Sequence, residues 1–128
     1  MNSVEEYFDH VRRLVQNLPD TQAERYDEHI LSATRGNLRL RLRFSDNALL
    51  EISEAIVIVR GELHWLSYRH HYQDSSAALV LRYDNAPHHS EVATYPDHKH
   101  SGDQILASVH PSIQQLLEEV RDVRQRAS

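Results

Sequence analysis

The chain has 128 residues, 40% of them hydrophobic and 26% charged, which suits one globular domain over residues 1–128. A net charge of −5 at pH 7 excludes a generally basic nucleic-acid binder, and the lack of cysteine excludes disulfide scaffolds and thiolate zinc sites. No apolar run approaches the roughly 20 residues of a membrane-spanning helix, and the acidic N-terminus does not resemble a secretory signal. We therefore expect a cytoplasmic protein without a membrane partner.

Both ends of the chain show the periodicity of amphipathic helices. Near the N-terminus, Ser3 and Glu6 have the spacing of a capping box, and apolar residues then recur at helical spacing until Pro19. Near the C-terminus, an apolar stripe of the same period follows Pro111 and continues to Val123. The sequence therefore predicts one helix at each end.

Between these helices, alternating apolar and polar residues predict strands. The clearest strand covers residues 37–44, where Leu40 and its apolar neighbours face the core and Arg41 faces solvent. Further strands are expected over residues 48–59, 63–72 and 78–83, with an earlier one near 29–33. Because the connections are short, neighbouring strands should be antiparallel. We therefore predict an α+β domain with a meander of four or five antiparallel strands, packed by the two helices and followed by a long histidine-rich loop over residues 86–108.

Histidine is unusually frequent, with 10 residues in the chain, and it is concentrated after the last expected strand. There the sequence reads Arg-Tyr-Asp-Asn-Ala-Pro-His-His over residues 82–89 and Tyr-Pro-Asp-His-Lys-His over residues 95–100. Acid, amide, imidazole and ammonium groups thus gather in a segment where sheet packing does not require them. Functional groups are often found on such loops.

Three interpretations of this segment are open. The histidines concerned are His88, His89, His98 and His100. They could bind zinc or another divalent metal, with Asp84 or Asp97 as a carboxylate ligand. They could instead act as general acid and base in phosphodiester cleavage, with Lys99 stabilising the charge on phosphorus. In the third interpretation they order the loop by forming hydrogen bonds with backbone groups.

A second group of interest, residues 65–73, interleaves aromatic and cationic side chains on an expected strand. Strict alternation would place Trp65, Arg69 and His71 on one side of this strand and Tyr68 on the other. Such a surface could stack bases and bind phosphates, or it could be an aromatic cluster packed under a helix.

Glu54 stands out because it interrupts an otherwise apolar strand. A carboxylate in such a position needs a partner, so we expect Glu54 either to point at a site or to hold an arginine. His10, His29 and His110 are scattered through the sequence, and we assign them no role.

Taken together, four segments of the chain resemble the TumE-type toxin family of prokaryotic toxin–antitoxin systems. They are the two histidine-rich segments described above, Tyr-Arg-His-His-Tyr-Gln at residues 68–73 and Ser-x-Thr-Arg-Gly-Asn at residues 32–37. The resemblance extends from Val4 to about Gln115. It implies a small toxin whose partner is an antitoxin protein, usually a helix-turn-helix DNA binder from a neighbouring reading frame.

The resemblance also implies which residues are functional. The family's pattern falls on Tyr68, His71, Arg82, Asp84, Asn85, His88, His89, His98, Lys99 and His100. The chain departs from this pattern at His70, where an aromatic residue is usual, and at Asp97, where another histidine is expected.

We predict from these observations a toxin that cleaves RNA, and hence an endoribonuclease, by histidine acid–base catalysis. The candidate catalytic residues are His71, Asp84, His88, His89, His98, Lys99 and His100. The candidate substrate-binding residues are Tyr68, Arg69, Arg82 and Asn85. One alternative is a non-enzymatic binding protein whose histidine-rich loop is structural or binds a divalent metal, and another is metal-dependent phosphodiester hydrolysis. Any metal or other cofactor, and the formation of a homodimer, stay open.

Overall fold

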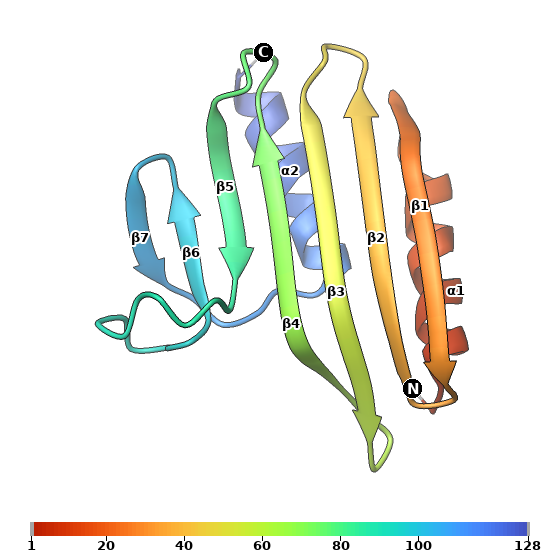
Figure 1. The fold of residues 1–128 in the computed structure, drawn as a ribbon. Helices are drawn as coiled ribbons and strands as arrows, with labels where there is room; N and C mark the ends of the chain where they lie inside the picture. The colour runs from red at the N-terminus through yellow and green to blue at the C-terminus, as the bar shows by residue number, and fades with distance from the viewer. Residues whose placement is uncertain (1, 128) are drawn as a thin grey trace.

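The computed structural model describes residues 2–127, in which helix α1 (Val4–Gln16) is followed by seven strands and helix α2 (Ile113–Ala127). The strands are β1 (Thr21–Ser32), β2 (Arg35–Phe44), β3 (Leu49–Val59), β4 (Glu62–Gln73), β5 (Leu79–Asp84), β6 (His98–Ser101) and β7 (Gln104–Ala107). They form one sheet in chain order, with each strand antiparallel to the next (Figure 1). The predicted α+β class and the antiparallel meander are confirmed.

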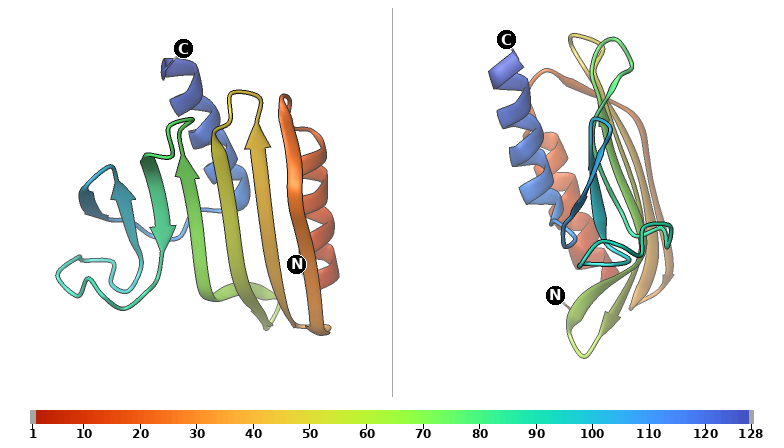
Figure 2. Two further views of the ribbon diagram at one scale, coloured as in Figure 1. Left: turned by 45° about the horizontal axis from the view of Figure 1, so that its top comes forward. Right: turned by 90° about the vertical axis from the view of Figure 1, so that its left-hand side faces the viewer.

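Both helices pack on the same face of the sheet, which we call the covered face (Figure 2). The even-numbered residues of β2 and β3 point toward the helices, and Leu38 and Leu50 are fully buried there. Phe8 of α1 and Leu116 of α2 are fully buried in the same core. Among residues 2–127, no helix combines the length and apolar character needed to cross a membrane.

Local sequence explains where α1 begins and how β2 is oriented. The Ser3 hydroxyl accepts a hydrogen bond from the Glu6 amide, so the predicted cap is confirmed. In β2, Leu40 is 2% exposed while Arg41 lies on the other side of the sheet, which confirms the predicted alternation.

The face opposite the helices is called the open face. The residues of this face are identified from the cross-strand register, because side chains of directly paired residues point to the same side of a sheet. Its central side chains are those of Arg25, Asp27, Arg39, Arg41, Glu51, Ser53, Arg69, His71, Arg82, Asp84, His98 and His100.

The sheet has more strands than the four or five predicted, because β6 and β7 lie inside the segment predicted as a loop. Each has only four residues, and the sequence of β6, His-Lys-His-Ser, contains no apolar residue that would reveal a strand period. Gly102 turns the chain between them with a φ of +59°, in the left-handed region that favours glycine. At the other edge, β1 begins at Thr21 rather than near residue 29. The first part of this strand was not predicted because its residues are mostly exposed and lack apolar alternation.

The predicted alternation of β4 is wrong for its first half because of a bulge at Leu66. The pairing of β4 with β3 passes from Ser67 directly to Trp65, so Leu66 is an extra residue. Trp65 therefore turns to the covered face and packs against the core. Beyond the bulge, Arg69 and His71 stay on the open face as predicted.

Candidate functional site

Two neighbouring rows of polar side chains cross the open face from β1 to β6. Cross-strand pairing aligns the first row as Arg25, Arg41, Glu51, His71, Arg82 and His100. It aligns the second row as Asp27, Arg39, Ser53, Arg69, Asp84 and His98. Since adjacent strands lie about 4.8 Å apart, each row spans roughly 24 Å. Arginines outnumber carboxylates in the two rows, and both rows end at a histidine of β6.

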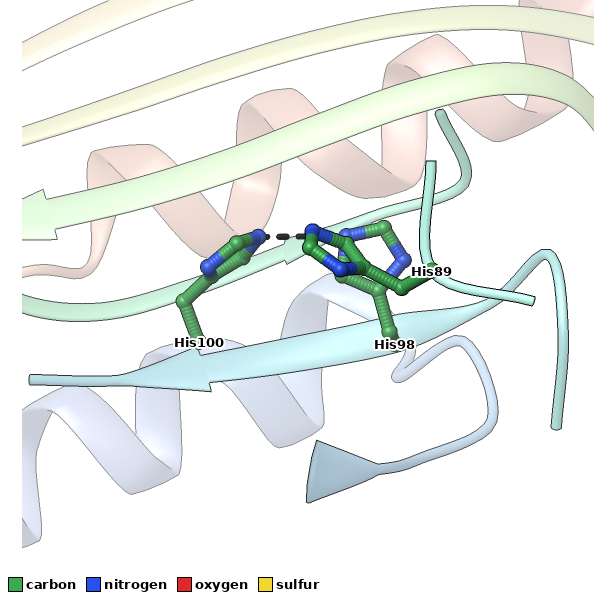
Figure 3. A group of neighbouring side chains, drawn as sticks. All are labelled: His89, His98 and His100. Atoms are coloured by element: carbon green, nitrogen blue, oxygen red, sulfur yellow. Dashed lines mark hydrogen bonds between the residues drawn. The ribbon is translucent and has the colours of Figure 1, made fainter. Parts of the chain in front are cut away.

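Four side chains meet at the β6 end of these rows and form what we call the histidine centre: Asp84, His89, His98 and His100. His98 and His100 come from β6, and His89 comes from the segment between β5 and β6 (Figure 3). Asp84 is the last residue of β5. The Nε2 atoms of His98 and His100 are 3.1 Å apart. Asp84 Oδ1 lies 3.0 Å from His98 Nε2, and Asp84 Oδ2 lies 3.6 Å from His100 Nε2. The centre of the His89 ring is 4.8 Å from that of His98 and 5.5 Å from that of His100.

Main-chain groups hold two members of the histidine centre in place. His98 Nδ1 lies 2.9 Å from the Pro96 carbonyl oxygen, which can only accept, so this nitrogen carries the proton. Asp84 Oδ1 accepts a hydrogen bond of 3.0 Å from the Ala86 amide. His98 is 1% exposed, whereas the side chains of His89 and His100 are 24% and 19% exposed. Burial lowers the pKa of His100, which favours a neutral imidazole that can accept a proton.

His71 orients the arginine next to the histidine centre. Arg82 Nε donates to His71 Nδ1 at 3.2 Å, and His71 Nε2 donates to Gln73 Oε1 at 2.9 Å. Burial, together with the charges of Arg82 and Arg69, lowers the pKa of His71 and so keeps this imidazole neutral. Both of its nitrogens are already occupied, so His71 is suited to position Arg82 rather than to transfer protons.

Comparison with known proteins identifies the family. The sequence model described as Toxin TumE matches residues 11–127. The chain belongs to the TumE toxin family. This membership confirms the resemblance seen in the sequence and supports a toxin role, with an antitoxin as partner in a toxin–antitoxin system. No curated protein and no solved structure matches the chain.

In β6, the Lys99 side chain lies on the face opposite its two histidine neighbours. Lys99 Nζ lies 2.6 Å from Glu119 Oε2 of α2 and 5.1 Å from the centre of the Tyr83 ring. Tyr68 is also on the covered face, where its hydroxyl donates to Asp97 Oδ1 at 2.8 Å. Neither Lys99 nor Tyr68 therefore joins the histidine centre.

Two further residues predicted to be functional flank the histidine centre. Asn85 Oδ1 accepts from the Tyr68 amide at 3.1 Å, and its Nδ2 donates to the Leu66 carbonyl at 3.2 Å. Asn85 thus stabilises the bulge of β4. His88 is exposed. Among residues 2–127, the ring nitrogens that lie close to those of His98 and His100 include one from His89 but none from His88.

A buried polar group on the covered face was not predicted from the sequence. Glu54 accepts a hydrogen bond from the Tyr7 hydroxyl at 2.6 Å and lies 2.8 Å from His70 Nε2. His110 Nε2 lies 4.0 Å from Glu54 Oε2, and its ring stacks on Trp65 with 3.6 Å between ring centres. Glu54 therefore holds a tyrosine and a histidine, and not the arginine that was one of the expectations for it. An acidic residue in an apolar strand was the only sequence signal of this group.

Proposed function

We propose that this toxin is an endoribonuclease that binds RNA along the open face and cleaves it at the histidine centre. The observation that supports this most directly is the pair of polar rows, which lead from a cluster of arginines to three converging imidazoles. A cationic track binds the phosphate backbone, and the imidazoles at its end can move protons.

The central arginines of the rows are suited to bind phosphate. A hollow of about 250 Å³ is lined by four arginines, one carboxylate and one hydroxyl: Arg25, Arg39, Arg41, Arg69, Glu51 and Ser53. Within residues 2–127, neither Arg39 nor Arg69 forms an ion pair with a carboxylate. Their guanidinium groups are therefore available to a polyanion, which would also relieve the repulsion among them.

The exposure of the histidines suggests a division of roles. His89 and His100 are partly exposed and can reach a bound phosphodiester, whereas the buried His98 cannot. We assign His100 as the general base that takes the proton of the RNA 2′-hydroxyl and protonated His89 as the general acid. His98 and Asp84 act as positioning residues, because each contacts His100 without reaching the surface.

The reaction that these groups fit is transesterification. The 2′-oxygen attacks phosphorus as His100 removes its proton, and the bond from phosphorus to the 5′-oxygen breaks as His89 protonates that oxygen. The products are a 2′,3′-cyclic phosphate and a 5′-hydroxyl end. Arg82, placed beside His100 by their cross-strand pairing, stabilises the negative charge that develops on the phosphoryl oxygens.

The test is RNA cleavage by the intact protein, purified with its antitoxin and then separated from it. We expect 2′,3′-cyclic phosphate ends, no cleavage of DNA, and at least a hundredfold loss of rate in His100→Ala, with His10→Ala of α1 as the matched control. Arg39→Ala should weaken RNA binding and reduce its salt dependence more than Arg121→Ala of α2 does. A wild-type protein that leaves RNA intact, or a His100→Ala variant of full activity, would refute the proposal and favour a non-enzymatic role.

A further inference from the structure

We propose that the histidine centre is also a binding site for a divalent metal ion of the zinc class. The ligands are one ring nitrogen each of His89, His98 and His100, with a carboxylate oxygen of Asp84 completing the set. This inference goes beyond the proposed cleavage of RNA and does not rest on it, because metal binding is measured directly.

The spacing of the candidate ligand atoms matches a tetrahedral site. One nitrogen of each of the three histidines lies within 4.8 Å of the others. The Nε2 atoms of His98 and His100, 3.1 Å apart, are close to the separation of about 3.3 Å expected for two nitrogens that each lie 2.0–2.1 Å from zinc. The Asp84 oxygens reach both of these nitrogens, at 3.0 Å and 3.6 Å. A single ion between the three rings of Figure 3 can therefore contact all four side chains after small adjustments.

The contacts around His98 show which of its nitrogens is directed toward the other candidate ligands. His98 Nδ1 carries its proton toward the Pro96 carbonyl, so a neutral His98 has a bare lone pair on Nε2. That lone pair faces a carboxylate oxygen of Asp84 and the Nε2 atom of His100. A cation held between these three atoms would contact each of them.

The surroundings of the centre support binding of the metal. The contact between His98 Nδ1 and the Pro96 carbonyl is the arrangement that commonly fixes a metal-binding imidazole with its other nitrogen toward the ion. The partial exposure of His89 and His100 gives an ion a path from solvent. A second group of possible metal ligands consists of Glu54, His70 and His110 on the covered face. The Glu54 carboxylate is fully buried and already contacts the Tyr7 hydroxyl and His70, so this group offers an ion no such path from solvent.

Metal binding has a defined consequence for the proposed catalysis. An ion at this site occupies the nitrogen lone pairs that acid–base catalysis by His100 and His89 requires. Saturating zinc should therefore inhibit RNA cleavage, and removal of the ion should restore it. The metal-free protein is the active form in this scheme.

The test is titration of the chelator-treated, intact protein with Zn²⁺ and with Co²⁺. Calorimetry monitors both titrations, and the visible absorption of tetrahedral cobalt monitors the second. We expect one ion per chain and an increase in melting temperature on binding. His100→Ala and Asp84→Asn should each weaken binding by about tenfold or more. The neighbouring exposed histidine provides the matched control, since His88→Ala removes an imidazole from the same segment without touching the centre.

Two results would overturn the metal site: no ion bound by the folded wild-type protein, or equal loss of binding in His88→Ala and His100→Ala. The test uses His100→Ala rather than a variant of His98, because His98 is buried and its replacement could prevent folding. The cobalt spectrum of His100→Ala therefore reports on the site itself. RNA cleavage is measured separately on the metal-free protein. Binding without cleavage would refute only the proposed function, whereas cleavage without binding would refute only the metal site.

Discussion

Acidification should destabilise the protein through His110, which packs on the covered face. Its ring stacks on Trp65, and the titratable groups that face it are Glu54, His70 and Tyr68. Burial lowers the pKa of His110 from its ordinary value of 6.5 to about 4. As the pH falls below 6.5 the unfolded chain binds a proton that the folded protein does not, so stability is lost between pH 6.5 and about 4.

The size of the effect follows from the two pKa values. Since one pKa unit corresponds to about 1.4 kcal/mol, the whole interval contributes about 3 kcal/mol to the free energy of unfolding. About 2 kcal/mol of this is lost by pH 5, where most unfolded chains but few folded ones carry the proton. The loss is a substantial fraction of the total stability of a small domain, which is of order 5–15 kcal/mol.

Urea denaturation at a series of pH values between 7.5 and 5 measures this loss. The wild-type protein also contains other groups that titrate, so His110→Phe is the reference: it keeps the ring against Trp65 and removes the buried Nε2, which has no hydrogen-bond partner. The wild type should lose about 2 kcal/mol more than this variant by pH 5. His88→Gln, at an exposed position, should follow the wild-type curve. Parallel curves for the wild type and His110→Phe would refute the reasoning.

Three other predictions test the fold and the assignment of its two faces. Leu40→Ala should cost about 2–5 kcal/mol of stability and Arg41→Ala less than about 1 kcal/mol, and similar losses in urea denaturation would contradict the register of β2. Gly36→Ala should lower the melting temperature and cost about 1–3 kcal/mol, because the added methyl group would lie 2.8 Å from the His29 carbonyl oxygen; a melting curve unchanged from wild type would contradict this. Lys99→Ala should cost about 1 kcal/mol through its contact with α2 yet keep toxicity in a growth assay, and a non-toxic but stable variant would return Lys99 to the site.

The sequence predicted the elements whose periodicity is long and regular. β2 alternates leucine with arginine over its whole length, and both helices have apolar stripes of several turns, so their type and orientation were confirmed. β6 was missed because four polar residues cannot display a period. The face predicted for Trp65 was wrong because Leu66 is a bulged residue. One extra residue moves every side chain that precedes it in the strand to the opposite face of the sheet.

The candidate site was visible in the sequence as a group of residues but not as an arrangement. The histidine-rich segment and the family resemblance both indicated Asp84, His89, His98 and His100. Treating residues 86–108 as a loop hid the alternation of β6, which separates Lys99 from the histidines on either side. The contact of Glu54 with His110 joins residues far apart in the chain, and no local pattern could have revealed it.

The histidine centre lies at the end of the sheet where the strands are shortest. β6 and β7 have four residues each, whereas β1 to β4 have 10 to 12. Elements with few contacts open locally at a lower free energy than the whole fold. We therefore expect the hairpin of β6 and β7 to detach while the longer strands stay folded, and this opening would carry His98 and His100 away from Asp84. Hydrogen exchange at the β6 amides, rather than the melting temperature, thus reports how much of the time the centre is assembled.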